Sequence, residues 1–478
     1  MNNYESVVVT GAAPVCCLGI GSEVFWANLL EGRSGIHTYE KVGIAAEQNA
    51  QKPEGTSYSA PAPVAGYIAD FSAKEFVQPR KNIKIMCRDV QLGLAAGALA
   101  LKQAQGDSDK KLSEQLGPER VGIDLGTAFI MSSISDIADA CLKGMAVEGA
   151  KPHGREDEVM PPNELVSALP SSNWEPTLSG KGDIELKAAS LEKYWGASFM
   201  DNLFPLWMLK YLPNMSACHL GIANDLQGPS NTQVLGDTGA LAAAIEAIHV
   251  IQRDAADAMV VGGVGNYIDD FNWMRYAWID RTSNAADPEG ACRPFDAARD
   301  GLAAAEAAGC LILESESSAK KRGVEPLAKV RAWANCTEGT HKYKISGKAI
   351  KNCLKLVMQN AGIKPEEVSH INANGWGTIN EDALEAQAIA EILPNVPVVA
   401  LKGGIGYAGS GSAAVEMVAA VLALKNGVLP PARNYSQPDP ACPIPVVHGV
   451  PMASDKPFAL TLTFDRNGGA AAIVFEKV

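Results

Sequence analysis

The 478-residue chain lacks the cysteine patterns of a disulfide scaffold or a zinc site. Its 10 cysteines form no C-x-x-C pair, and none is placed with a histidine at zinc-ligand spacing. The chain also lacks a P-loop motif, the G-x-S-x-G turn of hydrolases and the H-E-x-x-H motif of metalloproteases. We therefore expect no metal and no P-loop nucleotide site, and the cysteine usage favours a reducing cytoplasm.

Positive charge is also in short supply. The chain has 41 Lys and Arg against 54 Asp and Glu, a net charge of −13. That balance excludes a protein that binds nucleic acid or an anionic membrane through overall basicity. The longest apolar stretch, SAAVEMVAAVLAL, contains Glu416 and is too short to span a bilayer, and the start MNNYESVVVTG has no basic signal-peptide segment. We expect a cytoplasmic protein with no nucleic-acid and no membrane partner.

Short apolar strands alternate with helical segments along most of the chain. Apolar, β-branched runs predict strands, and longer Ala- and Leu-rich stretches predict helices. Their alternation indicates an α/β fold with mostly parallel sheets covered on both faces. The expected strands are Val7–Thr10, Val121–Leu125, Thr232–Leu235, Ala258–Val261, Cys310–Leu313, Ser369–Asn372, Val396–Leu401, Leu460–Phe464 and Ala471–Phe475. The expected helices are Ser22–Leu30, Arg88–Ala104, Thr238–Gln252, Lys348–Asn360, Asp382–Ile392 and Gly411–Leu424.

One glycine motif is typical of dinucleotide binding. Gly404-x-Gly406-x-x-Gly409 follows an expected strand and precedes an expected helix, which is the context of that motif. The acidic residue expected about 20 positions further on is missing, since that region reads NGVLPPARN. We therefore expect no nucleotide cofactor at these glycines.

A second candidate site lies at a helix start. Gly236 and Asp237 fall between an expected strand and a long Ala-rich helix. A side chain there lies at the positive end of the helix dipole, which suits an activated nucleophile or a bound anion. Asp is also a good N-cap, so a purely structural role for Asp237 stays open.

Three long runs identify a resemblance. VVVTGAAPVCCLGIGSEVFWANLLEGRSGI, PNMSACHLGIANDLQGPS and CRPFDAARDGLAAAEAAGCLILE resemble the β-ketoacyl synthases of fatty acid and polyketide synthesis. The resemblance covers roughly 7–35 and 212–478. It implies an α/β thiolase-like fold, duplicated in five α-β-α-β-α layers. It further implies an N-terminal half at 1–255, with insertions near 45–63 and 131–209, and a C-terminal half at 256–478, the two meeting near Asp254–Val264.

The resemblance also implies where the chemistry would lie. The family uses a cysteine thiolate that takes the acyl group and two histidines that assist decarboxylation and stabilise the enolate. In this chain the cysteine position is Asp237, the histidine of the NAHGTST run is Asn374 in NANGWGT, and the histidine of the KSxxGH run is Tyr407 in KGGIGY. A carboxylate would form a high-energy anhydride instead of a thioester, and Asn374 cannot shuttle a proton. We expect no intact catalytic set.

Other family positions are retained. Lys402 stands at the lysine of the KSxxGH run, Glu306 at the acid of the GEGAG run and Phe464 at the first phenylalanine of the FGFGG run. The second phenylalanine of that run, which gates the family's pocket, falls on Arg466. We expect Lys402 and Glu306 to pair with neighbours such as Asp237, so that buried charge is compensated.

Taken together, the resemblance implies a catalytically degenerate homologue, similar to chain-length-factor subunits. Such a subunit pairs with an active β-ketoacyl-acyl-carrier-protein synthase in polyketide or fatty-acid-type biosynthesis. The expected partner is that ketosynthase, as a heterodimer, or a second copy of this chain, through the strand Thr232–Leu235. An acyl carrier protein is a further possible partner, with acyl chains arriving on its phosphopantetheine and no other cofactor.

Two alternatives stay open. The first is an enzyme in its own right, a divergent acyltransferase or decarboxylase that uses Asp237, Tyr407 and Lys402. The second is a homodimeric scaffold without catalysis. Whether the chain is an enzyme is therefore undecided from the sequence.

Overall fold

A computed structural model describes residues 5–38, 64–128, 130, 203, 206–269, 272, 282–285, 287–339 and 344–478. The chain separates into two compact units, one of 1–130 with 211–478 and one of 131–210. The expected insertion near 45–63 and nearly all of the one near 131–209 lie outside the described residues. The fold below is that of the first unit.

Eleven strands of the described residues form one mixed sheet in two five-stranded parts, with the short β2 paired to β1. The first part contains β1 (Val7–Cys16), β5 (Val121–Thr127), β6 (Ser230–Val234), β7 (Ala258–Asn266) and β8 (Glu306–Ser315). The second contains β9 (Ala328–Thr337), β10 (Val368–Asn372), β11 (Val398–Val399), β14 (Phe458–Phe464) and β15 (Gly469–Glu476). The remaining short strands are β2 (Gly19–Ile20), β3 (Ile36–Thr38), β4 (Val64–Gly66), β12 (Val428–Leu429) and β13 (Met452–Ala453).

The two parts repeat the same topology. The strand orders are β6-β5-β7-β8-β1 and β11-β10-β14-β15-β9, in which the third strand along the chain is followed by the second, fourth, fifth and first. Parallel and antiparallel pairings also correspond at every step. The parts join through β1 and β9, where only Val8 and Val9 pair with the partner strand. The fold is therefore a duplication.

The repeat fixes where one half ends. β7 and β8 complete the first five-stranded part, and the second part begins at β9. The topology therefore changes in residues 316–327, and not at the boundary expected between 255 and 256 or near Asp254–Val264. The expected boundary lies just after the helix Gly239–Gln252. The pairing of β7 with β5 and of β8 with β7 shows that the first half includes two more strands beyond that point.

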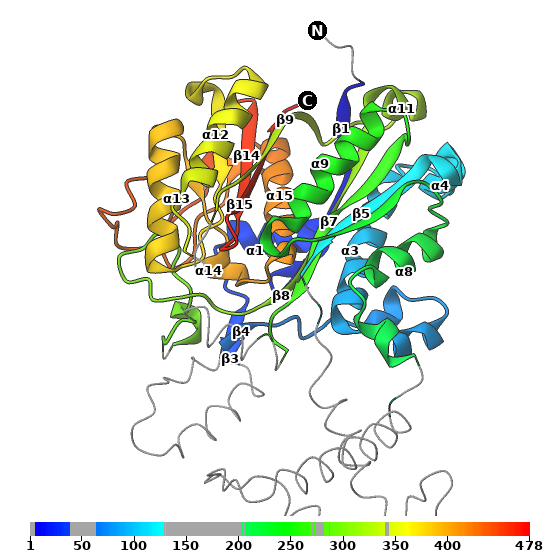
Figure 1. The fold of residues 1–478 in the computed structure, drawn as a ribbon, viewed down its shortest axis with the longest axis horizontal. Helices are drawn as coiled ribbons and strands as arrows, with labels where there is room; N and C mark the ends of the chain where they lie inside the picture. The colour runs from blue at the N-terminus through cyan, green and yellow to red at the C-terminus, as the bar shows by residue number, and fades with distance from the viewer. Residues whose placement is uncertain are drawn as a thin grey trace, which may run out of the picture. The chain divides into compact units, whose positions relative to one another are not determined.

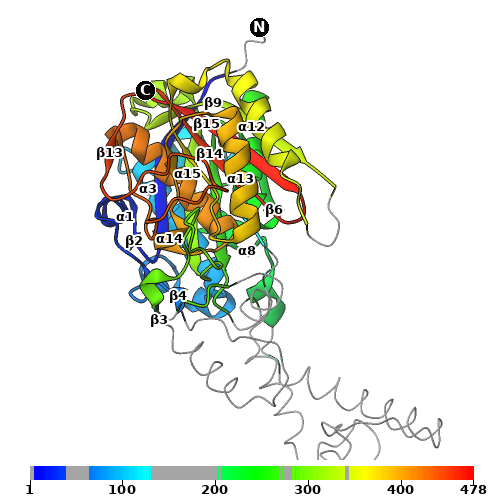
Figure 2. The ribbon, with the colours of Figure 1, turned by 90° about the vertical axis from the view of Figure 1, so that its left-hand side faces the viewer.

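Helices cover both faces of both parts in five layers, which confirms the expected layers (Figure 1). The expectation of mostly parallel strands is wrong, because the last two strands of each part pair antiparallel with their neighbours. α3 and α8 form one outer layer against β1, β8, β7 and β5, and α12 with α13 forms the other against β9 and β15. α9 and α15 lie between the two parts and contact strands of both. Figure 2 shows α12 and α13 in front of β14 and β15. The helices are α1 (Ser22–Leu30), α3 (Arg88–Ala104), α4 (Leu112–Leu116), α8 (Met215–Asn224), α9 (Gly239–Gln252), α11 (Glu316–Arg322), α12 (Lys348–Ala361), α13 (Ile379–Ile392), α14 (Lys402–Ile405) and α15 (Ser410–Asn426).

The burial of the two central helices, α9 and α15, explains why both are rich in alanine and other apolar residues. α15 is buried from Ser410 to Leu424, and α9 is buried at eleven of its positions. A helix that is apolar on all sides belongs in a protein interior. Their many alanines let each helix approach two layers of strands at once, so that both loops that begin these helices are held at the centre of the unit.

Candidate functional site

Asp237 lies at the centre of the unit, directly before α9. It belongs to a short 3₁₀ turn, Gly236–Thr238, that joins the edge strand β6 to α9. Gly236 has φ of +59°, which favours glycine at this turn. The Asp237 residue is 6% exposed. α9 begins without a side-chain cap, so Asp237 is not its N-cap.

Tyr407 is the direct partner of Asp237. Its hydroxyl donates to Asp237 Oδ2 at 2.9 Å, while Asp237 Oδ1 is buried without a partner among the described residues. Gly406 and Gly409 flank this tyrosine with φ of +72° and +52°. These conformations turn the chain from α14 into α15 and carry the tyrosine inward, which explains two of the glycines that resemble a dinucleotide motif.

Asn374 lies in a loop held by two carboxylates of α13. Glu385 accepts from the backbone N–H of Asn374 at 2.6 Å and of Gly375 at 2.8 Å. Asp382 accepts from the N–H of Trp376 at 2.9 Å and of Gly377 at 3.1 Å. Four consecutive backbone donors are thus bound by two side chains one helical turn apart, and the loop has a single defined conformation.

The Asn374 side chain is hydrogen-bonded at both its amide nitrogen and its amide oxygen. Its Nδ2 donates to the carbonyl oxygen of Phe464 at 3.1 Å, and its Oδ1 accepts from Lys402 Nζ at 2.9 Å. The structure therefore brings Asn374, Phe464 and Lys402 together, and brings Asp237 and Tyr407 together. Asp237 and Asn374 share no direct hydrogen bond; the network between them runs through Thr463, whose hydroxyl donates to the Asp237 carbonyl oxygen at 3.3 Å, next to Phe464.

Lys402 pairs with Glu416 and not with Asp237. Its Nζ lies 2.7 Å from Glu416 Oε1 and 2.5 Å from the carbonyl oxygen of Asn374, in addition to the contact with Asn374 Oδ1. The side chains of Lys402 and Glu416 are 1% and 0% exposed. All three ammonium hydrogens have acceptors, so the expectation that Lys402 pairs with Asp237 is wrong.

Glu306 pairs with Arg88, which also differs from the expected partner. Its two oxygens accept from Arg88 Nη2 and Nε, both at 2.7 Å, and Oε1 accepts from the backbone N–H of Ile68 at 2.9 Å. The Arg88 guanidinium lies 4.7 Å from the ring centroid of Phe71. Glu306 therefore anchors α3 to the segment that follows β4, away from Asp237.

Trp376 is the residue that the sequence analysis missed. Its ring centroid lies 5.0 Å from that of Phe464 and 5.9 Å from that of Tyr407, the latter edge-on. The Arg466 guanidinium lies 5.3 Å from the same indole, and Arg466 Nε lies 3.2 Å from Glu381 Oε1. The signal was present in NANGWGT, where Trp376 stands at a threonine of the NAHGTST run.

Burial decides the protonation of the acids in this cluster. Desolvation, with a smaller contribution from Asp465, raises the pKa of Asp237 to about 7. Desolvation likewise raises the pKa of Glu385 to about 8 and of Glu416 to about 7, although Lys402 lowers both. Hydrogen bonds and cations only partly offset the cost of holding these charges away from water. A protonated or half-protonated Asp237 is a poor nucleophile.

Asp237→Asn should flatten the pH dependence of stability. A carboxyl whose pKa is raised by folding stabilises the fold at low pH, and this contribution is lost as the pH rises from about 4 through 7. The amide keeps an oxygen for Tyr407 and does not ionise. We expect the variant to exceed the wild type in free energy of unfolding by about 1–3 kcal/mol at pH 8, with the difference vanishing near pH 4.

Urea denaturation at pH 4, 6 and 8 measures this difference. Asp107→Asn, at an exposed position, is the matched control and should leave the wild-type profile unchanged. A variant that is less stable than the wild type at pH 8 would show that Asp237 is ionised and well stabilised in the fold.

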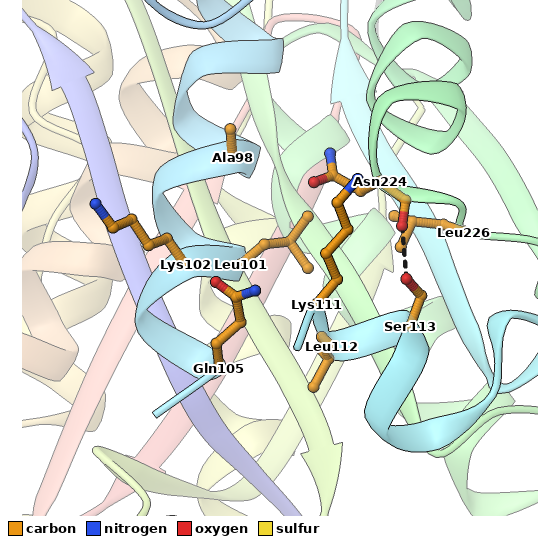
Figure 3. A pocket seen from close by; sticks show the side chains of 9 residues that line it. All are labelled: Ala98, Leu101, Lys102, Gln105, Lys111, Leu112, Ser113, Asn224 and Leu226. Atoms are coloured by element: carbon orange, nitrogen blue, oxygen red, sulfur yellow. Dashed lines mark hydrogen bonds between the residues drawn. The ribbon is translucent and has the colours of Figure 1, made fainter. Parts of the chain in front are cut away.

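A separate pocket of about 230 Å³ lies on the outer side of the unit, between α3, α4 and α8 (Figure 3). Lys111 Nζ donates to the carbonyl oxygen of Ala223 at 3.0 Å, and Ser113 Oγ donates to that of Asn224 at 2.7 Å. These bonds join α4 to the end of α8 across the pocket. Its lining contains none of the residues around Asp237, so it is a separate feature of the helix packing.

Two further searches cover the described residues alone. Within them, no group of three or more His, Cys, Asp or Glu side chains is placed to hold a metal ion. None of the helices in these ranges is long and apolar enough to cross a membrane.

The chain is similar in sequence to several known proteins that carry the same name. The 3-oxoacyl-[acyl-carrier-protein] synthase 2 of Synechocystis is 27% identical over 486 positions, with 100% of both chains covered. The synthase of the same name from Mycobacterium bovis is 33% identical over 287 residues, which are 58% of this chain and 68% of the relative.

Solved structures show the same fold. A β-ketoacyl synthase from Burkholderia phymatum superposes with a TM-score of 0.78 at 21% identity, covering 99% of this chain and 100% of the other. The ishigamide ketosynthase/chain length factor gives 0.75 at 20% identity, with 99% and 100% covered. A type II polyketide ketosynthase in complex with its acyl-carrier protein, AntDE:AntF, gives 0.73 at 22% identity, with 100% of both covered. The fold is thiolase-like.

The family assignment follows from the domains themselves. The β-ketoacyl synthase N-terminal domain matches residues 4–145 and 180–319, and the β-ketoacyl synthase C-terminal domain matches residues 327–436. The gap between the two matches falls at the same place as the change from β8 to β9. The two matches cover well over half of the chain, and the chain belongs to the β-ketoacyl synthase family.

Proposed function

We propose that this chain is a catalytically degenerate ketosynthase homologue that acts as a chain-length-factor-like partner of an active β-ketoacyl-acyl-carrier-protein synthase. The pathway would be polyketide or fatty-acid-type biosynthesis. The observation that carries the proposal is the hydrogen bond between Tyr407 and Asp237, because it joins the family's nucleophile position to one of its histidine positions. Neither side chain can replace the cysteine or the histidine of the family in acyl transfer and condensation. The two side chains are instead hydrogen-bonded to each other.

The chemistry of condensation supports a silent centre. Asp237 cannot hold an acyl group as a thioester, and Asn374 is bound at both ends to Lys402 and Phe464. An enolate needs donors aimed at the position where its charge develops. One hydrogen of the Asn374 amide is held by the Phe464 carbonyl oxygen, an amide cannot shuttle a proton, and the buried Tyr407 hydroxyl already donates to a carboxyl.

The alternative enzyme has less support. Acyl transfer or decarboxylation by Asp237, Tyr407 and Lys402 would need a lysine that faces the substrate. All three hydrogens of the Lys402 ammonium are directed at Asn374 and Glu416. The homodimeric scaffold is distinguished from the partner role by the association experiment below.

The edge strand β6 supports a partner. β6 pairs only with β5 among the described strands, so within these residues its other edge has no strand partner. Val234 and Leu235, at the end of this strand, are 46% and 47% exposed. Apolar side chains beside an open strand edge favour addition of a strand from another chain. The solved ishigamide ketosynthase/chain length factor and the AntDE:AntF complex support a ketosynthase and a carrier protein as partners of this fold.

Leu235→Asp should weaken association with the ketosynthase. A carboxylate placed in an apolar interface loses its hydration without gaining a partner, so we expect the affinity to fall by about 100-fold or more. The measurement is size-exclusion chromatography with light scattering, using this chain co-expressed with a β-ketoacyl synthase that has an intact Cys-His-His set. The wild-type chain should elute with that synthase as a one-to-one complex.

The matched control is Leu356→Asp, because Leu356 on α12 is similarly exposed, at 39%, and lies in the other half of the fold. That variant should associate as the wild type does. A chain that forms only homodimers, which Leu235→Asp dissociates, would support the scaffold and contradict the partner role.

A further inference from the structure

Two side chains near Asp237 are larger than those of the family's runs. Tyr407 replaces a histidine and Trp376 replaces a threonine, yet both are buried, at 5% and 2% exposure. Protein interiors are close-packed, so added volume must come from space that was open or from displaced neighbours. The strands and helices around these residues keep the family's fold, so the added volume lies in the space beside Asp237.

The two aromatic residues form a continuous row of ring contacts that begins at Asp237. Tyr407 donates to Asp237, and its ring lies edge-on to the Trp376 indole at 5.9 Å. Phe464, which is retained from the family, lies beside this row at 5.0 Å from the indole. An acyl carbonyl would need to come within about 3.5 Å of the Asp237 position to react there. The side chains of Tyr407 and Trp376 fill the space through which the carbonyl would have to approach.

Trp376 is held from two sides. On the inner side, Asp382 fixes its backbone N–H and that of Gly377. On the outer side, the Arg466 guanidinium lies over the indole at 5.3 Å and pairs with Glu381. The side chains of Arg466 and Glu381 are 16% and 17% exposed, so this pair is closer to solvent than the indole it contacts. A cation over an indole face is an attractive arrangement.

We infer that Tyr407 and Trp376 form an aromatic plug that excludes acyl chains from this chain's own pocket. Trp376 is the residue that determines the exclusion, and Arg466 and Glu381 are positioning residues that keep the indole in place. The inference rests on the proposed function, in which the acyl chain is attached to the partner. It adds that this pocket is closed by specific side chains and can be reopened.

Trp376→Thr, which restores the residue of the family's run, should create an acyl-binding pocket. We expect the wild-type chain to bind S-octanoyl-pantetheine with a Kd above about 1 mM. The variant should bind it at least about tenfold more tightly, since burial of two methylenes is worth about that factor. Isothermal titration calorimetry of the full chain, without any partner, measures both values. Trp333→Thr is the matched control, because Trp333 of β9 packs on His249 of α9, apart from the aromatic residues around Asp237, and should give no gain.

A second set of variants tests the positioning residues. Arg466→Ala keeps the indole but removes the cation that lies over it, so the affinity of this variant for the probe should rise about threefold above that of the wild type. Arg466→Lys keeps a cation over the ring and should bind the probe as weakly as the wild type does. In the Trp376→Thr background, Arg466→Ala should add nothing, because it acts through the indole. These variants also keep the test decisive if Trp376→Thr does not fold.

Two results would overturn the plug: a wild-type chain that binds the probe as tightly as Trp376→Thr, or a Trp333→Thr variant with the same gain. The outcome is independent of the partner role. If the chain binds a ketosynthase and Trp376→Thr gains no affinity, the plug is rejected and the proposed function stands. If Trp376→Thr gains affinity and no ketosynthase binds, the proposed function is rejected and the plug stands.

Discussion

Intact-protein mass spectrometry of the purified chain, incubated with labelled acyl-carrier or acyl-CoA thioesters, is expected to show no acyl adduct, and no malonyl unit should be condensed. Under the proposed function, Asp237 offers no stable acyl linkage, and Asn374 and Tyr407 stand at the positions of the family's two imidazoles. Loss of one transition-state donor typically costs about 10²–10³ in rate. With both donors and the nucleophile gone, condensation should fall to background.

Asp237→Cys alone should permit at most slow acylation and no condensation, because Trp376 and Tyr407 still fill the space beside the new thiol. The new thiol would lie at a helix start but beside a phenol instead of an imidazole base, so its thiolate fraction stays low. A β-ketoacyl synthase with an intact Cys-His-His set is the positive control for the assay. A stoichiometric adduct on the wild-type chain that disappears in Asp237→Asn would overturn the silent centre and favour the alternative enzyme.

Lys402→Met should lower the free energy of unfolding by about 3–5 kcal/mol at pH 8. The substitution removes the only ion-pair partner that the described residues provide for the buried Glu416, and it leaves Asn374 Oδ1 without its donor. Glu416 can respond by taking up a proton, since burial already raises its pKa to about 7. The loss should therefore shrink as the pH falls from 8 to 5, where the carboxyl is neutral in the fold.

Guanidinium denaturation at the two pH values measures the effect. Lys351→Met, which removes a pair with Glu391 between side chains that are 46% and 56% exposed, is the control and should cost less than about 1 kcal/mol. Lys402→Met combined with Glu416→Leu should recover part of the loss, because no uncompensated charge remains. A loss at Lys402 that does not change with pH would contradict the role of Glu416.

The sequence predicted the helices better than the strands. The predicted limits of Ser22–Leu30 and Arg88–Ala104 are those observed for α1 and α3. β1 was predicted to end before Gly11, yet it continues to Cys16 with a register shift at that glycine. A Cβ at Gly11 would collide with the carbonyl oxygen of Ala100 in α3, so this glycine permits close helix packing and does not end the strand. Local pattern cannot distinguish these two uses of glycine.

The site shows a similar division. The residues to examine were predictable, because each replaced position lies in a run that matches the family. Their partners were not, because Glu416, Glu385 and Arg466 reach the cluster from different helices and loops through contacts that are distant in sequence. The expected pairing of Lys402 with Asp237 failed for that reason. Charge compensation was the correct principle, but only the fold decides which carboxylate is closest.

The hydrogen bond between Tyr407 and Asp237 has an evolutionary consequence. Under the proposed function, a Cys at 237 would leave the buried hydroxyl of Tyr407 without its carboxylate acceptor, and a His at 407 would remove the phenol that donates to the buried Asp237 carboxyl. Each first step toward an active enzyme therefore costs stability before any activity can be selected. If the proposed function holds, mutual dependence of this kind would act as a ratchet, because further change in the partner role would cost less stability than a return to catalysis.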